Sequence, residues 1–213
     1  MKILIVGLGL IGGSLAKALS AYTDAKVVGM DKDDKTLALA LDEGAIRYIA
    51  GEPDLEDADV TILCLTPQNI INFVKENHEK MNKNGLVLDV CGVKRDIMAC
   101  FRKYFFENGP QYIGMHPMAG RELFGYEHAL VNLFQGASLV MTKDLSWTTT
   151  STGRSWRNTS TPWAFASWCR RRRKPTTRSS PTPRSWRTLS PAPTSKARRC
   201  CARKATAPAP SAI

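Results

Sequence analysis

The sequence lacks the marks of several protein classes. No apolar run approaches the roughly 20 residues that a membrane-spanning helix needs. The six cysteines form no C-x-x-C pair and show no Cys/His ligand spacing, which argues against a disulfide framework and a zinc site. The opening MKILIVGLGLIGG has neither the polar region nor the small-residue cleavage site of a secretory signal. We therefore expect a cytoplasmic protein.

Acidic residues are missing from the last third of the chain. All 19 Asp and Glu lie in residues 1–144, where 15 Lys and Arg leave a net charge of −4. Residues 145–213 carry the other 15 Lys and Arg, together with all five Trp and eight of the twelve Pro. The net charge of +11 therefore averages two unlike segments. Only the first segment has the composition of an ordinary globular enzyme, and we infer function from it.

Residues 1–144 alternate between short apolar runs and segments with helical periodicity. The apolar runs predict strands at 2–6, 26–30, 60–65, 85–90, 111–115 and 137–142. Apolar residues at helical spacing predict helices at 11–21, 34–43, 68–81 and 95–106. Continuous hydrophobic runs such as 60–65 are typical of strands that are buried on both faces of a parallel sheet. The pattern predicts an α/β domain with a Rossmann-type, doubly wound parallel sheet.

A glycine-rich turn follows the first predicted strand and begins the first predicted helix, with the residues Gly7-Leu8-Gly9-Leu10-Ile11-Gly12. In dinucleotide-binding folds the first glycine permits a tight turn and the second lets the backbone approach a pyrophosphate. The third allows close packing of helix on strand. The N-terminus of the helix offers unpaired N–H groups to the anion. We predict that these six residues bind the cofactor.

An acidic residue stands where such a cofactor site needs one. Asp31 ends the second predicted strand 19 residues after Gly12, close to the roughly 20-residue spacing at which a carboxylate meets the ribose hydroxyls. A glycine-rich turn with an ordinary surface aspartate is the structural alternative, and the joint occurrence of both features argues against it. Because a carboxylate repels a 2′-phosphate, the sequence favours NAD over NADP, with Lys32 as a weak counter-argument.

Three other strand ends carry candidate residues. His116 begins the segment HPMAG directly after the strand predicted at 111–115, where an imidazole can accept a hydroxyl proton as hydride leaves. A loop histidine with a structural hydrogen bond is the alternative. Lys94, in the turn after the strand at 85–90, could hold a substrate carboxylate, although an ordinary turn fits equally well. Thr66 and Pro67 follow the strand at 60–65 and are predicted to border the cofactor.

At these motifs the chain resembles the prephenate dehydrogenase family of tyrosine biosynthesis. The resemblance covers residues 1–142 in five segments: VGLGLIGGSLAKAL (6–19), VVGMD (27–31), LCLTP (63–67), DVCGVK (89–94) and HPMAGRELFG (116–125). It implies oxidative decarboxylation of prephenate to 4-hydroxyphenylpyruvate, with hydride transfer to NAD and His116 as proton acceptor. It also places Gly92, Lys94 and Glu122 on the substrate side. Many family members have serine where this chain has Gly92, so that hydroxyl is missing here.

Residues 145–213 do not resemble the helical second domain with which family members dimerise. We predict that this tail is disordered, and we hypothesise that the reading frame has shifted near residues 142–146. Codons rebuilt in the shifted frame can spell acidic helical segments similar to that domain. Without those helices the nucleotide-binding domain would expose apolar surface, and we expect poor turnover of prephenate. The alternatives are an arogenate dehydrogenase, or a nucleotide-sensing or nucleic-acid-binding protein that uses the basic tail.

Overall fold

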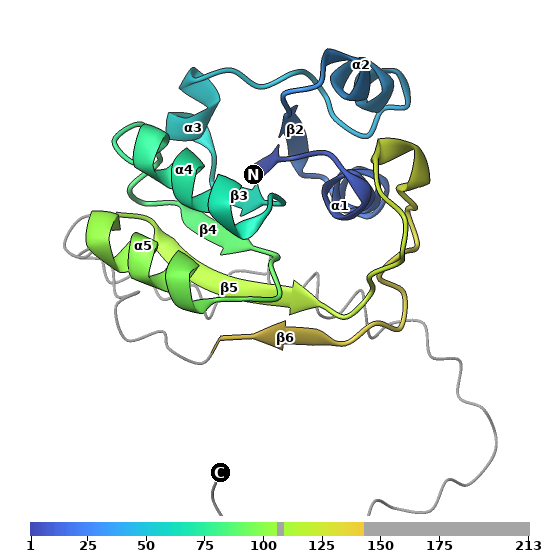
Figure 1. Cartoon of the computed structure of the whole chain (residues 1–213). Coiled ribbons are helices and arrows are strands. Elements are labelled where there is room, and N and C mark those ends of the chain that lie inside the picture. The colour runs from blue at the N-terminus through green and yellow to red at the C-terminus, as the bar shows by residue number, and fades with distance from the viewer. Residues whose placement is uncertain (106–108, 143–213) are drawn as a thin grey trace, which may run out of the picture. The chain divides into compact units, whose positions relative to one another are not determined.

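A six-stranded sheet organises the computed structural model, which describes residues 1–105 and 109–142. The strand order is β2-β1-β3-β4-β5-β6, and the first five strands are parallel (Figure 1). The last strand is antiparallel to its neighbour. The strands are β1 (Lys2–Val6), β2 (Lys26–Met30), β3 (Val60–Leu63), β4 (Leu86–Asp89), β5 (Gln111–Pro117) and β6 (Leu139–Met141).

Helices cover both faces of the sheet, because the parallel strands are apolar on both sides. They are α1 (Leu10–Tyr22), α2 (Asp34–Asp42), α3 (Pro53–Asp57), α4 (Pro67–Asn77) and α5 (Arg95–Phe105), with a 3₁₀ turn η1 (Tyr126–His128). In β1, Ile3 and Ile5 share a core cluster with residues of α1, α2 and η1. The alternate residues Leu4 and Val6 share a second cluster with residues of α3, α4 and α5. This arrangement confirms the doubly wound α/β fold.

The sheet reverses its direction of growth at β1. From β1 the chain passes to β2 on one side and then crosses to β3 on the other. The connections that follow β1 and β3 therefore lead to helices on opposite faces of the sheet, α1 and α4. Open α/β sheets bind their ligands at the carboxyl ends of the strands, where the strand order reverses in this way. The turn that begins at Gly7 and the Thr66–Pro67 segment lie at this edge, because each follows one of these two strands.

Several local features differ from the sequence prediction. The pattern predicted a parallel sheet, but β6 is antiparallel to β5, and the helix predicted at 68–81 ends at Asn77. The strand β5 continues to Pro117, so His116 lies inside it rather than in the loop after it. The short helix α3 was not predicted. Residues 47–50 lie beside β2 as a rudimentary parallel edge strand, with a bridge between Gly29 and Ile49 and a hydrogen bond of 2.8 Å from the Ala50 N–H to the Gly29 carbonyl.

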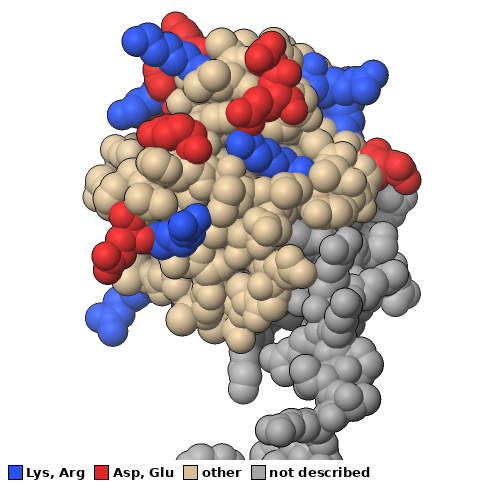
Figure 2. Space-filling view, turned by 90° about the vertical axis from the view of Figure 1, so that its right-hand side faces the viewer, with Lys and Arg blue, Asp and Glu red and all other residues tan. Residues whose placement is uncertain are grey.

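The carboxyl edge of the sheet carries exposed apolar side chains. Val93 follows β4 and is 62% exposed, and Phe124, in the segment after β5, is 86% exposed. Figure 2 shows a largely uncharged area bordered by acidic and basic side chains on the side of the molecule to which β4 and β5 point. Within the described ranges, no helix is long and apolar enough to cross a membrane. The predicted tail, residues 145–213, lies outside the described residues.

Candidate functional site

The glycine motif forms a tight connection between β1 and α1. Gly7 has a φ of +90°, and its N–H donates to the Met30 carbonyl at 2.8 Å. A Cβ on Gly12 would lie 1.8 Å from the Gly7 carbonyl oxygen, so only glycine allows the helix to pack this closely on the turn. A Cβ on Gly9 would meet nothing within 4 Å. The backbone is thus closely surrounded by other atoms at Gly7 and Gly12, whereas space remains next to Gly9.

The other residues of the motif contribute backbone rather than side chains to this site. Leu8 and Leu10 are buried, and Ile11 packs partly buried against the core cluster on the α1 face. Gly9 precedes the first residue of α1 and supplies no side-chain cap. The first N–H groups of a helix have no partner within the helix. The N-terminus of α1 therefore suits an anionic group next to Gly9.

Asp31 lies beside this turn, at the end of β2. One carboxylate oxygen accepts a hydrogen bond of 2.6 Å from the Leu8 N–H, and the other accepts one of 3.0 Å from the Asp33 N–H. The structure therefore brings the glycine motif and the acidic residue together. The two residues in contact, Leu8 and Asp31, are 23 positions apart in the sequence. This geometry fits a dinucleotide with its pyrophosphate at α1 and a ribose near Asp31.

Thr66 and Pro67 lie where α4 begins. Thr66 has an extended backbone and precedes the helix, and Pro67 occupies its first turn. The Thr66 side chain is exposed and makes no capping hydrogen bond. Because β3 neighbours β1 in the sheet, this segment follows the strand next to the glycine turn. Its role at the border of the cofactor stays a prediction.

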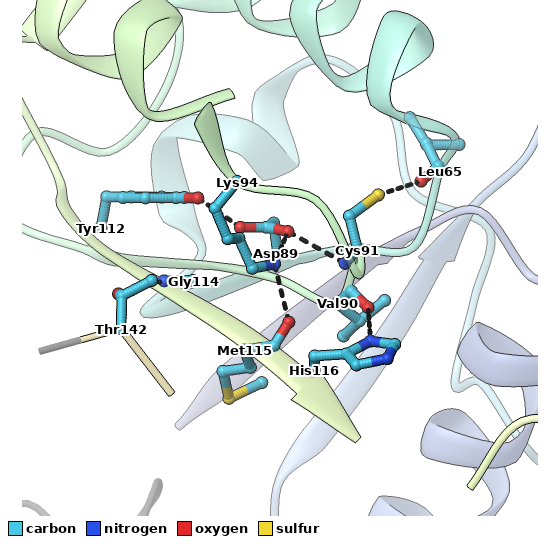
Figure 3. Close-up of polar contacts among 10 residues, drawn as sticks. All are labelled: Leu65, Asp89, Val90, Cys91, Lys94, Tyr112, Gly114, Met115, His116 and Thr142. Atoms are coloured by element: carbon cyan, nitrogen blue, oxygen red, sulfur yellow. Dashed lines mark hydrogen bonds and ion pairs between the residues drawn. The ribbon is translucent and has the colours of Figure 1, made fainter. Parts of the chain in front are cut away.

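His116 lies on β5, with its ring beside the turn that follows β4 (Figure 3). Its Nδ1 is 3.3 Å from the Val90 carbonyl oxygen. A Cβ on Gly92 would lie 3.5 Å from Cε1 and 3.6 Å from Nε2 of the imidazole. The structure thus brings His116 and Gly92 together, and an added side chain at position 92 would meet the ring at ordinary contact distance.

Lys94 reaches a buried acidic group instead of pointing freely into solvent. Its ammonium group forms an ion pair with Asp89 and donates to the Met115 carbonyl at 2.8 Å (Figure 3). Asp89 is fully buried and also accepts hydrogen bonds from the Tyr112 hydroxyl and, at 2.9 Å, from the Cys91 N–H. Burial, followed by the neighbouring Asp89 carboxylate, raises the pKa of Tyr112.

Sequence reasoning missed Asp89 and Tyr112 as members of the site. The available signal was an aspartate that ends an otherwise apolar strand, since a buried carboxylate requires partners. Glu122 is exposed in the segment between β5 and η1, and its role toward a substrate stays a prediction.

Neither of two cysteines near the site is suited to act as a nucleophile, because burial raises the pKa of the Cys64 and Cys91 thiols. In residues 1–105 and 109–142 no three His, Cys, Asp or Glu side chains gather at a metal site.

A family model described as "Prephenate dehydrogenase, nucleotide-binding domain" matches residues 15–152. The chain belongs to the prephenate dehydrogenase family. A prephenate dehydrogenase of Lactococcus lactis subsp. cremoris is 30% identical over 148 residues, which cover 67% of this chain and 41% of the relative. The chain thus spans about two fifths of the length of that curated relative.

Two solved structures of the prephenate dehydrogenase group resemble the chain. The arogenate dehydrogenase of Synechocystis is 26% identical, with a TM-score of 0.67 over 79% of this chain and 57% of that structure. Prephenate dehydrogenase from Aquifex aeolicus, in complex with hydroxyphenyl propionate and NAD⁺, is 25% identical, with a TM-score of 0.64 over 78% of this chain and 56% of that one. The fold and the family are therefore shown by independent comparisons.

Proposed function

We propose that residues 1–144 form an NAD-binding domain. The open backbone at Gly9, the close packing of Gly12 on Gly7 and the fixed carboxylate of Asp31 support this proposal. The N–H groups at the start of α1 would hold the pyrophosphate, and Asp31 would accept hydrogen bonds from ribose hydroxyls. A 2′-phosphate would meet the Asp31 carboxylate, so NADP would bind less well. The Aquifex relative binds NAD⁺.

The reaction we propose is the oxidative decarboxylation of prephenate to 4-hydroxyphenylpyruvate, in the cytoplasm. Bound NAD would accept the hydride from the ring carbon that bears the hydroxyl. The imidazole of His116 would take the hydroxyl proton, and the carbon–carbon bond to the ring carboxylate would break to release carbon dioxide. The observation that carries this proposal is the place of His116 at the carboxyl end of β5, on the same sheet edge as the glycine turn.

Three other residues would contact the substrate. Gly92 lies against the His116 ring and would offer only backbone groups where many relatives have a hydroxyl. Lys94 has three N–H donors, of which Asp89 and Met115 occupy two. The third is the one we propose for a substrate carboxylate. Glu122, exposed after β5, completes the proposed set.

Arogenate is a second candidate substrate. The Synechocystis arogenate dehydrogenase resembles this chain at least as well as the Aquifex prephenate dehydrogenase does. Arogenate carries an amine where prephenate carries a keto group, so the reacting ring is the same in both. His116 and the cofactor site would serve either substrate.

We further propose that the chain as written turns over its substrate poorly, because residues 145–213 are an out-of-frame remnant of the family's second domain. Such a domain would dimerise and close the site, and apolar side chains such as Val93 and Phe124 are exposed at the carboxyl edge. The alternative, a basic tail that binds nucleic acid, predicts steeply salt-dependent binding that is lost when residues 145–213 are deleted.

Comparison of two proteins tests this function. Resequencing across codons 138–150 establishes whether the shifted frame is open, and the gene is then expressed as written and with the frame restored. We expect the restored protein to form NADH with prephenate or arogenate, and the chain as written to bind NAD with little turnover. A restored protein that binds NAD but oxidises neither substrate would refute the proposed reaction. Stop codons throughout the shifted frame would refute the frame shift.

A further inference from the structure

Asp89 anchors a buried polar cluster in which only Lys94 has a proposed contact with the substrate. Its carboxylate accepts hydrogen bonds from the Lys94 ammonium, the Tyr112 hydroxyl and the Cys91 N–H. Burying an ionised carboxylate is costly unless it is paired and hydrogen-bonded. Here the Lys94 ammonium compensates the charge. Burial raises the pKa of Tyr112, so this phenol stays protonated and remains a donor.

The cluster joins the two backbone segments that flank the His116 ring. On one side, Val90 lies between Asp89 and Cys91. The Asp89 carboxylate accepts a hydrogen bond of 2.9 Å from the Cys91 N–H and so spans Val90. On the other side, the Lys94 ammonium donates to the carbonyl of Met115, the residue before His116. Figure 3 shows Lys94 and Asp89 between the turn after β4 and the strand β5.

A glycine on β5 gives Lys94 room to make this connection. A Cβ on Gly114 would lie 3.0 Å from Cδ and 3.1 Å from Cε of Lys94. The aliphatic stem of Lys94 therefore packs against β5 at Gly114. The ammonium group can then contact β4 through Asp89 and β5 through Met115 at the same time.

The hydrogen bond of the His116 ring determines which nitrogen is the base. A backbone carbonyl only accepts, so the Val90 oxygen 3.3 Å from Nδ1 requires the proton of the neutral imidazole on Nδ1. Nε2 then carries a free lone pair. A Cβ at position 92 would lie 3.6 Å from Nε2 and 3.8 Å from Nδ1, so the ring faces an exposed position that carries no side chain.

We propose that Asp89, Lys94 and Tyr112 are positioning residues that hold Val90 and Met115 so that His116 carries its proton on Nδ1 and presents Nε2 as the base. The identity of the hydroxyl that Nε2 deprotonates rests on the proposed function. The tautomer itself is a property of this chain without cofactor or substrate. Its measurement can therefore fail or succeed independently of the proposed reaction.

The test is the imidazole nitrogen chemical shifts of the full chain, measured by NMR with isotopically labelled histidine. The spectra are recorded at about pH 8, where histidines with ordinary pKa values near 6.5 are neutral. His116→Gln assigns the His116 signals by their loss. We expect the wild-type His116 to show the Nδ1–H tautomer. We expect Tyr112→Phe and Asp89→Asn to lose that preference and give a mixture with Nε2–H.

His78 provides an internal control. Its Nδ1 lies 3.0 Å from the Lys75 carbonyl oxygen, so it is also expected as Nδ1–H, and it has no contact with the Asp89 cluster in the described hydrogen bonds. A folded variant keeps the His78 signature. If Asp89→Asn unfolds the chain, His78 also loses the Nδ1–H signature. The result for the milder variant Tyr112→Phe then tests the proposal.

A matched variant, Tyr126→Phe, removes another tyrosine hydroxyl that donates to a carboxylate, that of Glu43, and should leave His116 unchanged. An Nε2–H tautomer in the wild-type chain would overturn the proposal. Retention of Nδ1–H at full strength in both Tyr112→Phe and Asp89→Asn would also overturn it. An intact tautomer in a frame-restored protein without prephenate or arogenate turnover would refute only the proposed reaction.

Discussion

The carboxylate of Asp31 accepts a hydrogen bond of 2.6 Å from the backbone N–H of Leu8, which lies inside the glycine motif. The end of β2 is thereby tied to the turn after β1, and the second carboxylate oxygen is held by the Asp33 N–H at 3.0 Å. The acidic group is thus oriented before any cofactor arrives. A preorganised acceptor loses little freedom on binding, which favours affinity and discrimination.

Replacement of Asp31 tests cofactor choice. Asp31→Asn removes the charge that repels a 2′-phosphate, so we expect the preference for NAD over NADP to fall by about tenfold, or about 1.4 kcal/mol. Isothermal titration calorimetry with both cofactors measures this ratio. Asp34→Asn, at an exposed position in the first turn of α2, is the matched control and should leave it unchanged. An unchanged ratio in Asp31→Asn would show that this carboxylate does not discriminate.

Two alanine substitutions in the glycine motif should separate stability from binding. A Cβ at position 12 would lie 1.8 Å from the Gly7 carbonyl oxygen, so Gly12→Ala should destabilise the domain by about 1–3 kcal/mol. A Cβ at position 9 meets open space, so Gly9→Ala should fold normally and bind NAD more weakly. Thermal denaturation and calorimetry separate the two effects. Full NAD affinity in Gly9→Ala would place the pyrophosphate elsewhere.

Substitution of His116 tests the proposed base in the frame-restored protein. His116→Asn should lower kcat at least about 100-fold, in the range expected for loss of a general base, while the Kd for NAD stays within about twofold. His128→Asn, at the end of η1, is the control and should retain activity. Steady-state kinetics and NAD titration give both quantities. A His116→Asn protein with near-normal kcat would assign the proton transfer to another group.

Asp54 should make the stability of the domain dependent on pH in acid. Burial alone would raise its pKa, but hydrogen bonds from Lys2, Tyr48 and Gly51 outweigh burial and lower the pKa from 3.8 to about 2. Because the folded-state pKa is the lower one, this stabilisation is present above about pH 4 and is lost as the pH falls toward about 2.

Asp54→Asn tests that dependence. At neutral pH we expect the variant to lose roughly 1 kcal/mol of unfolding free energy, a figure that includes solvent screening at the protein surface. The difference from wild type should shrink as the pH falls from about 4 to about 2. Urea unfolding at a series of pH values measures it, with Asp24→Asn at an exposed position as control. A difference that does not depend on pH would show that ionisation of Asp54 contributes nothing to stability.

Most of the fold could be predicted from the sequence, because strands, helices and turns depend on patterns of neighbouring residues. Apolar runs gave the strands, and the turn at Gly7 with the aspartate after β2 gave the expected cofactor site. The extension of β5 through His116 was not predictable in this way. It depends on antiparallel pairing with β6, in which His116 faces Val140. Local patterns do not report such long-range pairing.

The polar cluster of Asp89, Lys94 and Tyr112 next to His116 could not be predicted either, because it also depends on long-range contacts. Asp89 and Tyr112 lie 23 positions apart and meet only because β4 and β5 are neighbours in the sheet. The sequence predicted a substrate-binding role for Lys94, but it did not show that the Lys94 ammonium contacts Asp89. The bridge between Gly29 and Ile49 was also missed, since a single pairing at the edge of the sheet leaves no periodic pattern.

The most direct test of the account is a calorimetric titration of the full chain with NAD, followed by the same titration with NADP. The account predicts one NAD bound per chain and at least tenfold weaker binding of NADP, because the glycine turn receives the pyrophosphate and Asp31 excludes the 2′-phosphate. A folded chain that binds neither cofactor, or that binds NADP more tightly than NAD, would contradict it.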